Sequence, residues 1–151
     1  MKHILALDMA TKTGWATATV SGVEDFRKKT GDSRGMIYVR FVSWLMEMDE
    51  HVSPELIVYE RPHSRGRAAT ELLNGLLAHL QAHCERRGIE YTDCPSTTLK
   101  KFATGKGNAS KGEMMAAYRK RFGVEPIDDN ECDAVWLHLW AQEQFGVEVK
   151  V

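Results

Sequence analysis

Short apolar runs separated by polar turns predict a β-hairpin at the start of the chain. Residues 3–7 form an apolar run that ends at Asp8, and residues 13–20, rich in Thr, Val and Trp, form a second run. The first run has almost no polar position, which is typical of a strand buried on both faces. Residues 23–29 follow with a weaker alternation and are interpreted as a third strand.

Apolar residues recur at helical spacing along the rest of the chain. The longest such pattern ends at Gly88, which is suited to a left-handed helix cap. Between the helical segments, the apolar run 55–60 predicts a buried parallel strand, and residues 89–92 predict the last strand. The predicted helices cover residues 35–48, 68–84, 110–122 and 128–145.

This order of elements predicts an α/β fold. Three strands are followed by a helix, a strand, a helix, a strand and further helices, which indicates a mixed five-stranded sheet flanked by helices. No internal repeat, low-complexity tract or linker divides the 151 residues. We therefore interpret residues 1–151 as a single domain.

The composition is that of an ordinary globular domain, with 43% hydrophobic and 27% charged residues. Cys84, Cys94 and Cys132 are odd in number and have no CxxC spacing, which argues against a disulfide framework and a zinc ribbon. We expect a reducing, cytoplasmic setting. No signal-peptide pattern and no apolar run of about 18 residues is present, so export and membrane insertion are not expected.

The formal net charge of −1 hides a segregation of charge along the chain. Residues 95–121 contain seven basic side chains and one acidic side chain, whereas residues 122–133 contain five acidic and no basic side chains. A solvated surface of balanced charge would mix the two signs. The pattern indicates a surface for a polyanion beside a cation site.

Two acids end apolar strands. Asp8 and Glu60 each follow a buried run, and open α/β sheets collect ligands and catalytic groups at the carboxyl ends of their strands. A buried carboxylate must pair with a base, become protonated or bind a metal. Considered singly, either acid also fits a helix cap or a salt bridge, for instance with Lys12 or Arg61.

A third acid lies one turn inside the last predicted helix. Acids in a first helical turn complement the helix dipole, which accounts for Asp129 but poorly for Asp133. Asp8, Glu60, Asp133 and either Asp129 or Asn130 would form an oxygen-rich site suited to Mg²⁺ or Mn²⁺. The sequence leaves the choice between Asp129 and Asn130 open.

Two other motifs are weaker. His79 and His83 have a spacing that can bind zinc, but the Glu of an HExxH motif is missing, so an ordinary helix surface is the better interpretation. Residues 107–113 imitate a phosphate loop but lack the Lys of a Walker A motif, so no nucleotide cofactor is expected. Arg61 and Arg65 fit solvated loop charges and contacts to a nucleic acid equally well.

Four segments together resemble the RuvC-type Holliday-junction resolvases of the ribonuclease H-like superfamily, especially the small bacteriophage-associated members. They cover most of the chain in the family's order: the first strand, acid and hairpin, the second acidic strand, the basic segment, and the final Asp with its helix. Lys100 and Lys111 fall on the two characteristic lysines of the family. The four segments are 4–16, 56–60, 100–111 and 133–135.

The resemblance implies a ribonuclease H-like fold and a metal-dependent endonuclease that resolves four-way DNA junctions by paired symmetric nicks. It implies two Mg²⁺ ions, with Mn²⁺ as a substitute, a homodimer, and a role in DNA recombination and repair. The helix 68–84 is our candidate for the dimer surface, because it is expected to expose apolar residues beyond those that the sheet covers. The resemblance implies Asp8, Glu60 and Asp133 as catalytic residues; we add Asp129 to them, with Asn130 as a further metal ligand candidate. The resemblance implies DNA contacts by Lys100 and Lys111, and the charge pattern adds Lys101, Lys106, Arg61 and Arg65 as candidates.

The chain departs from the family pattern at two places. Asn130 stands where the family usually has an acid or His, and Arg61-Pro62 follows Glu60 where resolvases have an aromatic residue nearby. The alternatives are therefore a nuclease for flaps, forks or RNA-containing duplexes, and a non-catalytic nucleic-acid-binding module.

Overall fold

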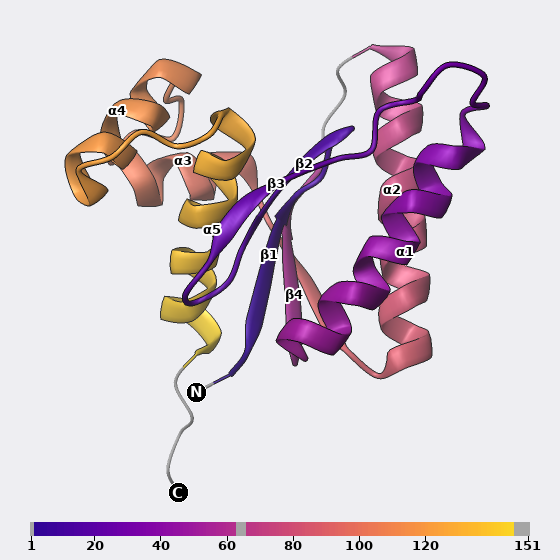
Figure 1. Ribbon diagram of the computed structural model, residues 1–151. Coiled ribbons are helices and arrows are strands. Elements are labelled where there is room, and N and C mark those ends of the chain that lie inside the picture. The colour runs from indigo at the N-terminus through magenta and orange to yellow at the C-terminus, as the bar shows by residue number, and fades with distance from the viewer. Residues whose placement is uncertain (1, 63–65, 147–151) are drawn as a thin grey trace, which may run out of the picture.

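A mixed five-stranded sheet with the strand order β3-β2-β1-β4-β5 forms the centre of the computed structural model, which describes residues 2–62 and 66–146 (Figure 1). Strand β2 is antiparallel to both of its neighbours, β1 and β3, whereas β4 is parallel to β1 and β5 is parallel to β4. The predicted mixed sheet is confirmed. The strands are β1 (Ile4–Asp8), β2 (Lys12–Ala16), β3 (Ser21–Asp25), β4 (Leu56–Glu60) and β5 (Glu90–Cys94).

The second and third strands begin and end earlier than the sequence predicts. β2 stops at Ala16 because Thr17 starts a tight turn, in which its backbone N–H and its hydroxyl both donate to the carbonyl of Val20. This turn brings Ser21 opposite Ala16 and so sets the register of β3. Apolar and β-branched residues continue the strand pattern through the turn. The sequence therefore predicts the end of β2 and the start of β3 too late.

Within residues 2–62 and 66–146, five helices cover the two faces of the sheet, with α1 and α2 on one side and α3, α4 and α5 on the other (Figure 1). The sequence analysis missed α3, because it is short and polar and only Leu99 in it is fully buried. No helix in the part of the chain that the structure describes is long and apolar enough to cross a membrane. The helices are α1 (Gly35–Val52), α2 (Arg67–Arg87), α3 (Ser96–Thr104), α4 (Lys111–Phe122) and α5 (Asp129–Phe145).

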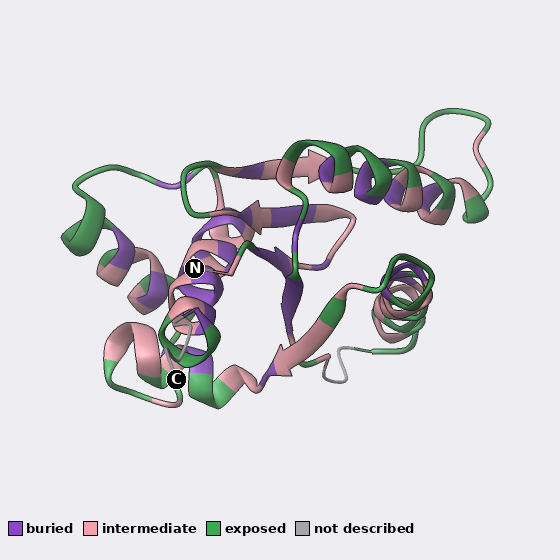
Figure 2. Cartoon of the chain, turned by 90° about the horizontal axis from the view of Figure 1, so that it is seen from below, coloured by how far each residue is buried: buried purple, intermediate pink, exposed green. Residues whose placement is uncertain are grey.

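The central strand β1 divides the apolar interior into two cores. Ile4 and Ala6 pack with α3, α4 and α5, whereas Leu5 and Leu7 pack with α1 and α2. Successive side chains of a strand point to opposite faces, so a strand covered by helices on both sides is apolar at every position. Figure 2 shows the resulting burial of the central strands between the two helical layers.

The beginning of α5 lies directly on β2. A Cβ atom on Gly14 would come within 2.0 Å of the backbone carbonyl oxygen of Asn130, so only glycine permits this approach. The side-chain amide of Asn130 also donates to the carbonyl of Lys12 over 2.9 Å. These contacts hold the first turns of α5 over the carboxyl end of β1, where the predicted acidic site lies.

Candidate metal centre

Three carboxylates meet at one edge of the sheet. Asp8 ends β1, Glu60 ends the parallel neighbour β4, and Asp133 lies one turn inside α5. Each offers one oxygen atom, and the three oxygens lie within 4.8 Å of one another. We call Asp8, Glu60 and Asp133 the carboxylate triad. The structure therefore brings together three of the four acids that the sequence analysis predicted.

The electrostatics of the triad favour a bound cation. The pKa of Asp133 is raised from 3.8 to about 7, first by burial and then by the negative charges of Glu60 and Asp129. Lys111 and Lys100 act on the pKa of Asp133 in the opposite direction. Carboxylates that crowd one another in a shielded site repel when ionised, and a divalent cation removes that repulsion.

The two candidates for a fourth ligand have different surroundings. Asp129 lies outside the three-oxygen cluster, and its carboxylate is 3.1 Å from the ammonium of Lys111. Asn130 borders a small hollow together with Asp8, although its amide nitrogen is already engaged with the backbone of Lys12. Asp129 could join a metal site by releasing Lys111, whereas Asn130 could join through its amide oxygen.

A cavity of about 170 Å³ opens beside the triad and is lined by both acids and bases. Glu60, Asp129 and Asp133 contribute the acidic wall, and Lys100 and Lys111 contribute the basic wall. A phosphate group could enter this cavity, since two ammonium groups flank the carboxylates that would hold the cation. The two lysines implied by the family resemblance thus lie next to the triad.

The other predicted DNA contacts are more distant from the triad or already paired. Lys101 is exposed on α3, and Lys106 lies 2.8 Å from the carboxylate of Glu113. Arg61 borders the hollow beside Asp8 but forms a two-pronged ion pair with Asp93, with a closest distance of 2.8 Å. Arg65 lies outside the described residues.

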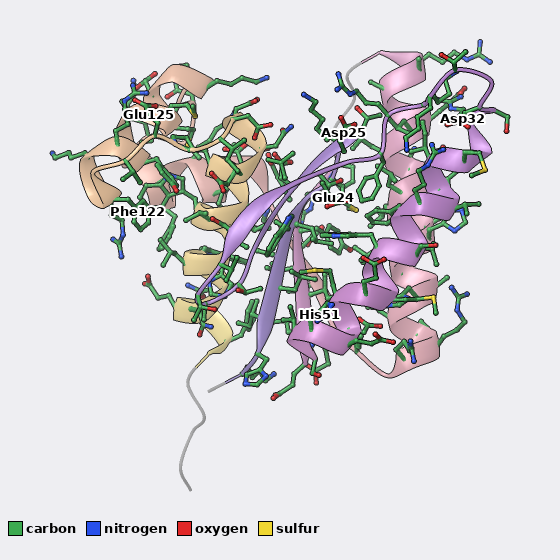
Figure 3. All side chains as sticks on the ribbon, viewed as in Figure 1. Glu24, Asp25, Asp32, His51, Phe122 and Glu125 are labelled. Atoms are coloured by element: carbon green, nitrogen blue, oxygen red, sulfur yellow. The ribbon has the colours of Figure 1, made fainter. Side chains whose placement is uncertain are left out.

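Acids farther along the same edge of the sheet are paired with bases. Figure 3 shows Asp25 at the end of β3 and Asp32 in the connection to α1. Arg27 lies 2.8 Å from Asp25, Arg40 lies 2.6 Å from Asp32, and the hydrogen bonds from these guanidinium groups lower the pKa of both carboxyls. Both carboxylates are therefore neutralised by a neighbouring guanidinium group and do not need a metal.

The two competing motifs have structural roles. Ser110 and Glu113 form a reciprocal capping box at the start of α4, so the segment that imitates a phosphate loop is a helix start. The ring of His79 stacks on Tyr38, whereas His83 is buried and its Nε2 lies 2.7 Å from a carboxylate oxygen of Asp49. The interpretation of both histidines as an ordinary helix surface is therefore wrong for His83.

The sequence analysis missed one residue of the site, Ser96. Its hydroxyl donates to Oε1 of Glu60, and its side chain lines the cavity beside the triad. The sequence carried a signal for Ser96, because this residue follows Pro95 directly after the last strand. The end of that strand lies at the same sheet edge as Glu60. The missing prediction of α3 concealed this signal.

Solved structures of junction resolvases have a similar fold. A Thermus thermophilus RuvC structure matches with a TM-score of 0.77 and 16% sequence identity, covering 95% of this chain and 96% of that chain. T. thermophilus RuvC in complex with a Holliday junction substrate matches with a TM-score of 0.78 and 17% identity, covering 95% and 97%. The yeast mitochondrial Holliday junction resolvase Ydc2 matches with a TM-score of 0.62 and 15% identity, covering 91% of this chain and 76% of that chain.

No family model matches the sequence, and no curated protein matches it either. The likeness to the solved structures is therefore one of fold. It extends over nearly the whole chain, and it confirms the predicted RuvC-like, ribonuclease H-like architecture.

Proposed function

We propose that this protein is a metal-dependent endonuclease that resolves four-way DNA junctions by paired symmetric nicks. The proposal depends on one observation: Asp8, Glu60 and Asp133, from three separate elements, converge beside two lysines in a RuvC-like fold. The matched RuvC structure that contains a Holliday junction substrate supports branched DNA as the substrate class.

The donor set fits a hard divalent cation. Carboxylate oxygens are the ligands that Mg²⁺ and Mn²⁺ prefer. The buried Cys132 thiol has its pKa raised to about 12, which keeps it protonated and a poor metal ligand. Asp8, Glu60 and Asp133 would hold two ions, with Asp129 or Asn130 as the fourth ligand. When bound, the ions would activate a water molecule and stabilise the leaving 3′ oxygen of the cleaved phosphodiester.

The lysines and arginines would hold the DNA rather than cleave it. Lys100 and Lys111 would contact phosphates next to the scissile bond, and Lys101 and Lys106 would support them from α3 and the following turn. Arg61 and Arg65 would contact the strand beyond Glu60, for which Arg61 must exchange Asp93 for a phosphate. Contacts of this kind make affinity depend on salt and do not read the base sequence.

Symmetric nicks in two strands need two active sites, so the proposal includes a homodimer. Helix α2 is our candidate for the dimer surface. Its Leu72, Leu73 and Leu77 are only partly buried by the rest of the chain, so they could bury further area against a second copy. The proposal also places the protein in the cytoplasm of a bacterium or phage-infected cell, in line with three free cysteines.

Cleavage assays on two DNAs test the proposal. The protein is incubated with a synthetic four-way junction or a matched linear duplex, in Mg²⁺ or EDTA, beside the variants Asp8→Asn and Asp133→Asn. We expect paired nicks in the junction alone, lost in EDTA and in both variants. Cleavage of flaps, forks or RNA-containing duplexes in preference to junctions would favour the broader nuclease, and salt-sensitive binding without any cleavage would favour the non-catalytic module.

A further inference from the structure

Ser96 is held against Glu60 by the register of the sheet. Strand β5 runs parallel to β4, and its last residue, Cys94, lies opposite Glu60. The backbone N–H of Arg61 donates to the carbonyl of Cys94 over 2.8 Å, which joins the chain beyond Glu60 to the end of β5. Helix α3 then begins at Ser96, two residues after the strand ends, so its first side chain lies over the Glu60 carboxylate.

The Ser96 hydroxyl is not needed by its own helix. Serine near a helix start commonly accepts a hydrogen bond from a backbone N–H. In α3 the cap position is Pro95, no side chain makes a cap hydrogen bond, and Ser96 instead donates its proton to Oε1 of Glu60. The contact is therefore directed at the carboxylate triad rather than at the backbone of α3.

A carboxylate has two oxygens and can bind a cation through one or both of them. The Ser96 hydroxyl donates to Oε1 of Glu60 and so fixes how this carboxylate is turned within the triad. We propose that Ser96 is a positioning residue, which orients the Glu60 carboxylate for binding a divalent cation. This inference rests on the proposed function, because it assumes that the triad binds a metal.

The size of the effect follows from other metal sites. Groups that hydrogen-bond to a metal ligand orient it, and their loss typically weakens metal affinity or activity by about 10- to 100-fold. Ser96 lines an open cavity and is not part of either apolar core, so removing its hydroxyl leaves the packing intact. A change in metal affinity can therefore be separated from a change in folding.

Direct metal binding tests the proposal without any DNA. Mn²⁺ is titrated calorimetrically into the wild-type protein and into Ser96→Ala, Ser96→Thr and Thr98→Ala. Ser96→Thr retains the hydroxyl, and Thr98→Ala removes a hydroxyl from an exposed position of the same helix turn. We expect Ser96→Ala to bind Mn²⁺ about 10-fold more weakly or worse, whereas Ser96→Thr and Thr98→Ala bind like the wild type.

The Mg²⁺ concentration for half-maximal cleavage gives a second readout and should shift by the same factor as the Mn²⁺ affinity. Wild-type affinity in Ser96→Ala would overturn the role of Ser96. The role of Ser96 would also be overturned if Ser96→Thr bound Mn²⁺ as weakly as Ser96→Ala and the melting temperature of the metal-free protein fell as well. If the wild type itself binds no Mn²⁺, the metal-dependent function fails, and this result is distinct from a failure of the Ser96 proposal.

Discussion

Two shielded groups of charged side chains lie on opposite sides of the sheet, and they are built in opposite ways. Between α1 and α2, the carboxylate of Asp49 is only 13% exposed and faces two bases, with His83 Nε2 at 2.7 Å and Arg87 Nε at 3.3 Å. At the carboxyl ends of β1 and β4, the carboxylates of the triad face one another instead.

This difference fits a structural role for the Asp49 group and the proposed metal-binding role for the triad. The Asp49 carboxylate lies at ion-pair distance from two bases, so the Asp49 group joins two helices through opposite charges. Acids that crowd one another raise the free energy of the ionised metal-free fold, and such arrangements cluster at functional sites. The comparison can be tested by changing one group while leaving the other intact.

The largest effect is expected on activity. Glu60→Gln keeps the size of the side chain but removes a charge from the triad, so metal-dependent cleavage should fall to the level of the EDTA control. Asp49→Asn is the matched control on the other side of the sheet and should retain the turnover of the wild type in its folded fraction. Mg²⁺-dependent cleavage by Glu60→Gln at the wild-type rate would contradict the proposal that Glu60 holds the metal.

The next effect concerns the pH dependence of stability. The pKa of Asp133 is about 7 in the fold and 3.8 without its surroundings, so between these values the folded state holds a proton that the unfolded state has lost. The free energy of unfolding of the metal-free protein should therefore fall as pH rises from about 4 to about 7, by up to about 4 kcal/mol.

Urea unfolding in EDTA at pH 5 and pH 8 measures this change. Asp133→Asn should reduce the difference between the two pH values, and Mg²⁺ should restore stability to the wild type at pH 8. An equal pH difference in the wild type and in Asp133→Asn would show that crowding in the triad is not its source.

A backbone change tests how the triad is assembled. In Gly14→Ala the new Cβ would meet the carbonyl of Asn130, so the start of α5 must move away from β2. We expect a loss of about 1–3 kcal/mol in unfolding free energy and a loss of cleavage, because Asp133 moves with α5. Gly112→Ala, which meets only the Ser110 hydroxyl at 3.8 Å, is the control and should remain active.

The α1–α2 group should matter for stability alone. Asp49→Ala leaves the buried ring nitrogen of His83 without its partner, and an unsatisfied buried polar group costs about 1–3 kcal/mol. Denaturant unfolding measures the loss, while single-turnover cleavage of the folded protein should be unchanged. Slower cleavage by fully folded Asp49→Ala would contradict a role for the Asp49 group in stability alone.

The smallest effect is expected at the basic wall. Lys111→Ala removes one phosphate contact, so the slope of the logarithm of junction affinity against the logarithm of salt concentration should decrease in magnitude by about 1. Lys120→Ala removes an exposed charge from the same helix and serves as the control. If Lys111→Ala and Lys120→Ala have equal salt slopes, the proposed contact between Lys111 and the DNA is wrong.

Much of the carboxylate triad could be predicted because it lies where regular elements end. Asp8 and Glu60 each close an apolar run, and parallel neighbouring strands end at the same edge of a sheet. Asp133 could be predicted because helical periodicity sets it apart from the acids of the first turn. The buried partner of His83 could not be predicted, because periodicity along α2 does not reveal that α1 covers this position.

The sequence alone determined the order of the elements other than α3, the segregation of charge and the acids at the two strand ends, since these depend on local periodicity and on the rules of parallel sheets. Only the tertiary structure decided that Asp133 lies against Glu60, that Asp129 pairs with Lys111 and that Ser96 bonds to Glu60. Each of these contacts joins residues far apart in the chain or in a helix that the pattern did not show. Their distances depend on how closely α5 approaches β2 at Gly14 and on where β5 ends, and no local pattern contains that information.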